Sequence, residues 1–186
     1  MNSRWMIRVT SGFAIFMLVL AMGGVRMVAQ TADSDEINRL LSDAKSEAVQ
    51  LENDADMLQS YTMSPMSWET HAMKLHSMRE HVNSMGKINQ QLHDQRAEGS
   101  PWQQEAIDRI SPLLRGMADK LTVTIKHLND HKSQIQMQPY RDYTHSNYDL
   151  ASRTTRMISD FVEYSQSKSR SEELEHRLEL PSTSSN

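Results

Sequence analysis

The sequence predicts an all-α protein, an antiparallel up-down four-helix bundle whose last helix extends beyond the others. Three observations predict this fold. The 186 residues include only 6 Gly and 5 Pro, which is too few for a turn-rich β fold. Apolar residues recur at steps of three and four in four separate segments. Three of these segments begin at a proline, which the first helical turn tolerates, namely Pro65, Pro101 and Pro139.

The first 30 residues have the order of a secretory signal peptide. A stretch with two arginines and no acidic residue precedes an uncharged apolar run over 12–22. Small residues that suit a cleavage site follow between Gly23 and Gln30. The apolar run is shorter than the ~20 residues of a membrane-spanning helix. We therefore expect a signal peptide over 1–30 that is removed on export, with an uncleaved anchor as the alternative.

Removal of this segment changes the charge of the chain. It contains three arginines and no acidic residue, so the formal net charge of −4 becomes −7. An acidic protein is poorly suited to nucleic acid, whose phosphates require a basic surface. The absence of cysteine excludes disulfides, a thiol nucleophile and thiolate metal sites. We expect a periplasmic or secreted protein that lies at a membrane only if its signal stays uncleaved.

The first two helices are expected over 35–61 and 66–96. Ser64 precedes the proline of the second segment and would cap that helix. In both segments the apolar residues form one stripe with a polar opposite face, as in a helix that packs on one side. The stripe positions are Ile37, Leu41, Ala44, Ala48, Leu51, Ala55, Leu58, Trp68, His71, Leu75, Met78, Val82, Met85, Asn89 and Leu92.

The third helix is expected over 101–132. Ser100 and Gln103 have the spacing of a capping box, and Gly99 suits the end of the preceding helix. Pro112 lies inside the segment and is expected to kink the helix, because it removes one backbone hydrogen bond. The stripe positions are Ile107, Ile110, Leu114, Met117, Leu121, Thr124, Leu128 and His131.

The fourth helix is expected over 139–178. Beyond Tyr164 its stripe positions become polar, so 166–180 is expected to be a solvated helical extension. We expect one bundle domain over 31–180 and a disordered tail over 181–186. The stripe positions are Tyr143, Asn147, Leu150, Thr154, Met157, Phe161 and Tyr164, with Ile158 and Val162 beside them.

Some stripe positions carry polar side chains. Such residues inside a bundle form polar layers that fix the register of the helices or line a small cavity. We expect register to be the role of these four: Asn89, Thr124, Asn147 and Thr154.

Three segments of the second half resemble a known group of proteins. Residues 100–110 (SPWQQEAIDRI), 140–143 (YRDY) and 158–164 (ISDFVEY) resemble segments of an uncharacterised exported bacterial helical-bundle family. The resemblance implies export and a helical fold. It implies no activity, substrate or cofactor.

Methionine and histidine are the residues that indicate a site. Ten of them lie between Met57 and His93, and thioether and imidazole groups are ligands that copper favours. In an up-down bundle the loops near 62–65 and 133–138 lie at the same end. That end is expected to gather the candidate metal ligands His71, His127, His131, Met63 and Met66. The alternative is that these residues are ordinary core and surface side chains.

No local enzyme motif is present: the chain lacks G-x-G-x-x-G, a P-loop, G-x-S-x-G and H-E-x-x-H. No carboxylate lies on a stripe, which excludes a di-iron carboxylate centre. We expect a non-enzymatic binding or scaffold protein without a cofactor. Its partner would be another envelope protein, or a second copy bound through the C-terminal helix. The alternative function is a copper- or haem-binding four-helix bundle that uses the methionine and histidine end.

Overall fold

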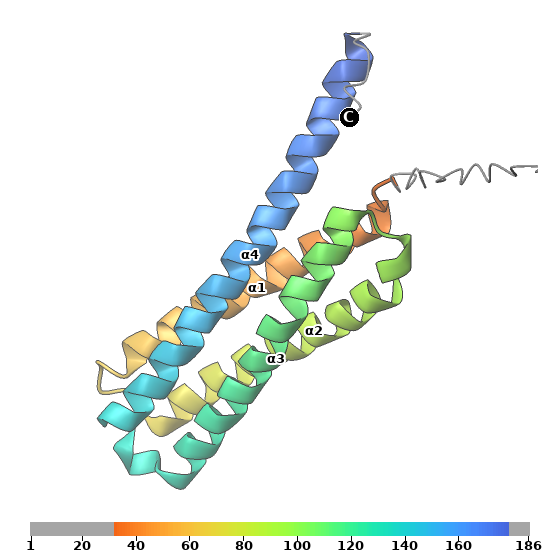
Figure 1. The fold of residues 1–186 in the computed structure, drawn as a ribbon. Helices are drawn as coiled ribbons and strands as arrows, with labels where there is room; N and C mark the ends of the chain where they lie inside the picture. Colours follow the sequence, from red (N-terminus) through yellow and green to blue (C-terminus); the bar gives the residue numbers. More distant parts are fainter. Residues whose placement is uncertain (1–31, 179–186) are drawn as a thin grey trace, which may run out of the picture.

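The computed structural model describes residues 32–178, which form four helices joined by short loops (Figure 1). Single turns of 3-10 helix occupy the second and third loops. Each helix packs against two others, α1 and α3 each lying between α2 and α4. This arrangement confirms the predicted antiparallel four-helix bundle. The elements are α1 (Asp35–Tyr61), α2 (Trp68–Asp94), η1 (Arg96–Glu98), α3 (Pro101–Asp130), η2 (Lys132–Gln134) and α4 (Gln138–Arg177).

Two predicted segments lie outside the described residues, namely the signal peptide over 1–30 and the tail over 181–186. Within residues 32–178, no helix combines the length and the apolar character that crossing a membrane requires. Export and the place of the protein in the cell stay predictions.

The second helix begins two residues later than predicted, at Trp68. The turn after α1 uses Ser64, whose backbone N–H donates to the Tyr61 carbonyl at 3.1 Å. The N-cap is therefore Ser67, whose hydroxyl accepts a hydrogen bond from the Thr70 N–H at 3.4 Å. The other helix ends lie within two residues of their predicted positions.

Polar layers join neighbouring helices at three of the four predicted residues, whereas the Thr154 hydroxyl donates to the Leu150 carbonyl of its own helix at 2.8 Å. The Ser111 hydroxyl of α3 lies 2.8 Å from the side-chain carbonyl oxygen of Asn89 in α2. Asn147 of α4 donates to the Thr124 hydroxyl of α3 at 2.6 Å. Helix α3 continues through Pro112, one residue beyond Ser111, so the proline does not divide the helix. These bonds fix the relative register of α3 and the helices on either side of it.

The buried face of α4 differs from the predicted stripe. Three predicted residues, Asn147, Leu150 and Thr154, are buried, but four larger ones are half-buried or exposed: Tyr143, Met157, Phe161 and Tyr164. The face that packs inward instead contains Tyr140, Thr144, Ala151, Thr155, Ile158 and Val162. Small side chains allow the helices to approach closely, and the Thr155 hydroxyl lies 3.0 Å from the Ala48 carbonyl of α1. Met157, Phe161 and Tyr164 therefore remain partly or largely at the surface.

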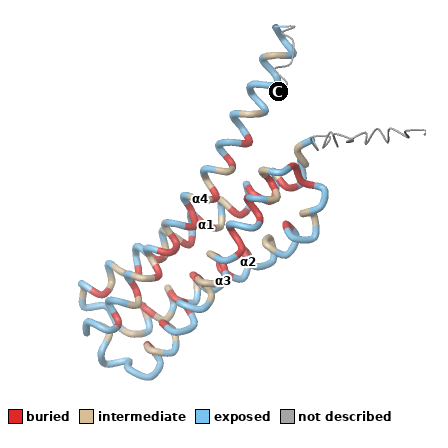
Figure 2. The backbone as a smooth tube through the Cα atoms, viewed as in Figure 1, coloured by how far each residue is buried: buried red, intermediate tan, exposed pale blue. Residues whose placement is uncertain are grey.

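The end of α4 projects beyond the bundle, as predicted. Buried residues line the interior of the bundle, and the projecting part of α4 is mostly exposed (Figure 2). Ser165 is the last buried residue of α4. Lys168 is half-buried, because its ammonium group pairs with Asp33 at 2.8 Å, before the start of α1.

Gly86 and Gly99 are expected to respond in opposite directions to alanine. A Cβ at Gly86, within α2, meets nothing within 4 Å, so Gly86→Ala is expected to stabilise the fold by about 0.5–1 kcal/mol. A Cβ at Gly99 would lie 2.8 Å from Cδ1 of Ile37, so Gly99→Ala is expected to destabilise it by about 1–3 kcal/mol. Urea denaturation measures both free energies of unfolding. Shifts of the same sign in the two variants would contradict this prediction.

Candidate functional site

The structure brings the three predicted histidines to one end of the bundle, around Tyr140. His71, in the first turn of α2, is buried, and its Nδ1 lies 3.2 Å from the Tyr140 hydroxyl. His127 of α3 is half-buried and stacks on Tyr140, with the ring centroids 6.0 Å apart. His131 stacks on His127 at 4.5 Å. Tyr140 is thus the centre of the cluster, and the sequence analysis did not assign it this role.

His131 is exposed, so its predicted place in the core is wrong. Helix α3 ends at Asp130, and His131 is the C-cap residue, where the backbone leaves the helical path. Its Nδ1 lies 3.2 Å from the carbonyl oxygen of His127, which requires Nδ1 to be the protonated, donating nitrogen. The ring therefore lies over the C-terminal end of α3, and its Nε2 takes no part in this hydrogen bond.

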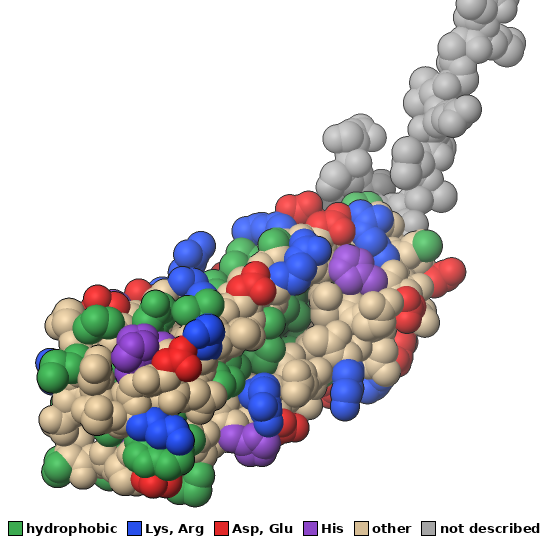
Figure 3. All heavy atoms as spheres, turned by 90° about the horizontal axis from the view of Figure 1, so that it is seen from below, with side chains coloured by type: hydrophobic (Ala, Val, Ile, Leu, Met, Phe, Trp, Pro, Cys, Tyr) green, Lys and Arg blue, Asp and Glu red, His purple; other side chains and the backbone are tan. Residues whose placement is uncertain are grey.

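The predicted sulfur ligands lie at the surface of the same end. Met63 is 75% exposed and Met66 is 41% exposed, in the turn between α1 and α2. In the part of the chain that the structure describes, no three His, Cys, Asp or Glu side chains are grouped so that they could hold a metal ion. The histidines on the face shown in Figure 3 also lie apart from one another. A copper site would need sulfur from these methionines, and it stays a prediction.

His71 is a buried imidazole with one unsatisfied nitrogen. Burial lowers the pKa of His71, so the ring is neutral at neutral pH. Its Nε2 has no hydrogen-bond partner among the described residues. Burial raises the pKa of Tyr140, which keeps the phenol protonated. In the tautomer with the proton on Nδ1, Tyr140 accepts that proton's hydrogen bond and Nε2 keeps a free lone pair.

A groove between α3 and α4 is the second candidate site. Its volume is about 560 Å³. Trp102 and Leu113 line it from α3, and Met157, Phe161 and Tyr164 line it from α4. The three α4 residues belong to the stripe that the sequence analysis placed in the core. We call this feature the α3–α4 groove.

Three arginines line the α3–α4 groove together with one acidic residue, Asp160. The guanidinium carbon of Arg109 lies 5.6 Å from the centroid of the Phe161 ring, a cation–π contact. Arg153 and Arg156 are exposed on α4, and neither forms an ion pair with any residue between 32 and 178. The groove therefore combines an apolar lining with positive charge, in a chain whose net charge is −4.

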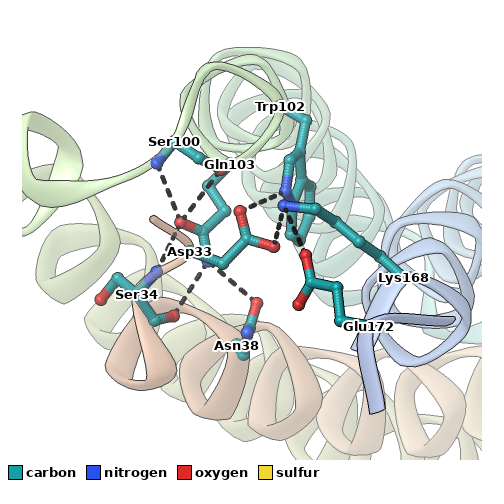
Figure 4. Close-up of polar contacts among 8 residues, drawn as sticks. All are labelled: Asp33, Ser34, Asn38, Ser100, Trp102, Gln103, Lys168 and Glu172. Atoms are coloured by element: carbon teal, nitrogen blue, oxygen red, sulfur yellow. Dashed lines mark hydrogen bonds and ion pairs between the residues drawn. The ribbon is translucent and has the colours of Figure 1, made fainter. Parts of the chain in front are cut away.

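Hydrogen bonds at the end of the bundle hold Trp102 in the groove wall. The indole N–H of Trp102 donates to the Asp33 carboxylate at 2.8 Å (Figure 4). The centroid of its ring lies 5.2 Å from that of Tyr164, in an edge-on contact. Lys168 contacts the same carboxylate at 2.8 Å. Partial burial raises the pKa of Asp33, but the hydrogen bonds from Lys168 and Trp102 outweigh it and keep the pKa below its usual value. The charged carboxylate thus links the start of α3 to α4.

The sequence itself contains a signal for this groove. Helix α4 carries two adjacent apolar faces, one with Ile158 and Val162 and one with Phe161 and Tyr164. Each helix of a four-helix bundle buries a single face against its two neighbours. Two apolar faces on one helix therefore indicate that one of them remains at the surface.

No protein-family model, curated protein or solved structure matches this chain. The resemblance of residues 100–110, 140–143 and 158–164 to an exported helical-bundle family stays an expectation. The function of the chain is therefore inferred from its own residues and their geometry.

Proposed function

We propose that this chain is an exported, non-enzymatic binding protein whose α3–α4 groove docks an acidic amphipathic helix of another protein chain. The observation that carries the proposal is the combination of partly exposed apolar side chains with two arginines, Arg153 and Arg156, that lack ion-pair partners in the described structure. An exposed apolar patch with a charged border is typical of a protein interaction site. An amphipathic helix is the standard partner of an apolar groove between two helices.

The length of the groove supports a helix as its occupant. The lining residues of α4 run from Arg153 to Tyr164, which corresponds to roughly 16 Å, or three helical turns. A docked helix can place leucines on Met157 and Phe161 and carboxylates beside Arg153 and Arg156. This match of shape and charge favours an acidic partner over a basic one.

The residues that line the groove support a binding role over a catalytic one. No Ser, Cys or His is among the described residues that line it, and Asp160 is its one carboxylate. Acyl transfer requires a nucleophile beside a base, and glycoside hydrolysis in most families requires two carboxylates. The groove offers apolar area and positive charge, which are means of recognition.

A designed peptide tests the groove. A helical peptide with leucines at steps of three and four, flanked by glutamates, is expected to bind with a Kd of about 1–100 µM, measured by isothermal titration calorimetry. Combined Arg153→Glu and Arg156→Glu substitutions are expected to weaken binding at least about tenfold, because they replace attraction by repulsion. Arg141→Glu, at an exposed site near the other end of α4, is the matched control. Equal affinity in all three proteins would contradict the proposal.

A second candidate function, copper or haem binding, is favoured by one observation at the histidine end. The Nε2 of His71 is buried without a hydrogen-bond partner in the described residues, as a ligand nitrogen would be before its ion binds. Titration with copper(I) distinguishes this function from ordinary packing. Affinity that His71→Ala abolishes and His176→Ala leaves unchanged would support it, and equal weak binding by all three proteins would contradict it.

A further inference from the structure

We propose that the helix docked in the α3–α4 groove is the projecting end of α4 from a second copy of this chain, in an antiparallel dimer. This inference rests on the proposed function, since it names the partner of the same groove. It starts from a row of residues on the outer face of α4, which we call the outer seam. Its members are exposed, apart from the half-buried Met157: Arg153, Met157, Asp160, Tyr164, Ser167, Ser171, Leu174 and Leu178.

The outer seam follows the spacing of a helix–helix interface. Successive members are four and three residues apart in alternation, so they lie on one face of α4 along its whole length. The two leucines of the projecting end therefore continue the face that lines the groove. Leu174 is 40% exposed and Leu178 is 62% exposed, with no other helix covering them in the described structure.

The seam is also symmetric. Its alternating spacing reads the same in both directions about a centre between Ser165 and Gln166. Two copies laid antiparallel about that centre place Leu174 of each copy opposite Met157 of the other. A two-fold dimer requires such a self-complementary surface, because every contact in it occurs twice.

The projecting end brings both carboxylates and cations to the groove. Residues 166–178 contain three glutamates and three basic residues, so their net charge is zero. The apolar contacts of Leu174 and Leu178 therefore carry the match between the two copies.

The shape of the molecule allows the two copies to meet in this way. Ser165 is the last buried residue of α4, and beyond the contact of Lys168 with Asp33 the helix projects past the bundle (Figure 1). The projecting residues 166–178 rise by about 20 Å, which matches the rise of residues 153–165 along the groove. In the antiparallel arrangement each bundle lies beside the other copy's projecting end, so the two bundles occupy opposite halves of the dimer.

Sedimentation equilibrium of the full chain tests the dimer. The wild type is expected to dimerise with a Kd of about 1–10 µM, and combined Leu174→Ser and Leu178→Ser substitutions are expected to raise this Kd at least about tenfold. Val49→Ser with Val123→Ser, at two exposed apolar sites away from the seam, is the matched control and is expected to dimerise as the wild type does. A wild type that remains monomeric up to about 100 µM would overturn the proposal.

An engineered disulfide tests the register of the two copies. The chain has no cysteine, so Met157→Cys in one copy and Leu174→Cys in another introduce the only thiols. Oxidation of the mixture is expected to link the two variants into a covalent dimer. Glu173→Cys, on another face of α4, replaces Leu174→Cys as the control and is expected to link poorly. Equal linking by both pairs would overturn the register.

The same variants separate this inference from the proposed function. The Leu174→Ser and Leu178→Ser variant keeps every groove residue, so the designed acidic peptide is expected to bind it. Peptide binding together with a monomeric wild type would leave the groove function standing and overturn the dimer. Failure of both peptide binding and dimerisation would overturn both proposals.

Discussion

Replacement of Gln103 by alanine is expected to lower the free energy of unfolding by about 3 kcal/mol. The side chain is buried at the start of α3 and joins the beginnings of α1 and α3 (Figure 4). Its oxygen accepts hydrogen bonds from the backbone N–H groups of Ser34 at 2.9 Å and Ser100 at 3.0 Å. Its nitrogen donates to the Ser34 carbonyl and to the Asn38 side chain, both at 2.9 Å.

The expected loss has two causes. Alanine leaves several part-buried polar groups without partners, and each such group costs about 1–3 kcal/mol if water cannot reach it. It also leaves a cavity where the amide was. Gln91→Ala is the matched control, because Gln91 is exposed on α2, and it is expected to change stability by less than about 0.5 kcal/mol. Urea denaturation measures the free energy of unfolding of both variants. Equally small losses would show that the Gln103 hydrogen bonds contribute little to stability.

Gln103 is also expected to affect the groove, because it directly follows the groove residue Trp102 in the chain. Trp102 is bonded to Asp33, directly before the Ser34 that Gln103 holds. Loss of the Gln103 bonds is therefore expected to loosen the end of the groove as well as the bundle. Peptide binding by Gln103→Ala, measured under conditions where the variant is folded, would show whether the two are coupled.

The helices and their order could be predicted because their signals are local. Ser100 and Pro101 start α3 where expected, and the stripe of α1 is buried as expected, because capping and periodicity depend on neighbouring residues. The start of α2 was misplaced because Ser64 and Ser67 are both suitable caps. The turn after α1 decides between them, and it uses Ser64.

The rotation of α4 could not be predicted in the same way. Its two apolar faces satisfy the same periodicity, so the choice depends on which face fits against α1 and α3. The face with Ala151 and Ile158 packs inward, whereas Phe161 is half-buried and Tyr164 is exposed. The groove follows from this choice, and for that reason it was absent from the sequence analysis.

The histidine end could be predicted in part. Up-down topology alone brings His71 and His127 to the same end, and the structure places both against Tyr140. The position of Tyr140 depends on the rotation of α4, so its central place could not be inferred. His131 was misplaced because one residue at the end of α3 determines whether a side chain points inward or covers the helix end.

The chain is expected to lose stability as the pH falls from about 7 to about 5, and His71→Gln is expected to remove much of this loss. Burial lowers the pKa of His71 in the folded state, whereas in the unfolded chain it is near 6.5. Below that value the unfolded chain binds a proton that the folded chain does not, so acid favours unfolding. The effect approaches about 1.4 kcal/mol per pH unit until the folded pKa is reached, and it is absent above about pH 7. Partial burial and the neighbouring His131 also lower the pKa of His127, which adds a contribution of the same sign.

Urea denaturation at several pH values between 7.5 and 5 measures this dependence. His176→Gln is the matched control, because His176 is exposed on the projecting end of α4, and it is expected to retain the wild-type pH dependence. His71→Gln is expected to be less stable than the wild type at pH 7.5, because glutamine fills the space beside Tyr140 less well, yet to lose less stability on acidification. If the free energy of unfolding of His71→Gln fell with pH as steeply as that of the wild type, His71 would have the same pKa in the folded and unfolded chains. The buried ring beside Tyr140 would then have to open to water in the native state, and the acid-sensitive group would lie elsewhere among the histidines.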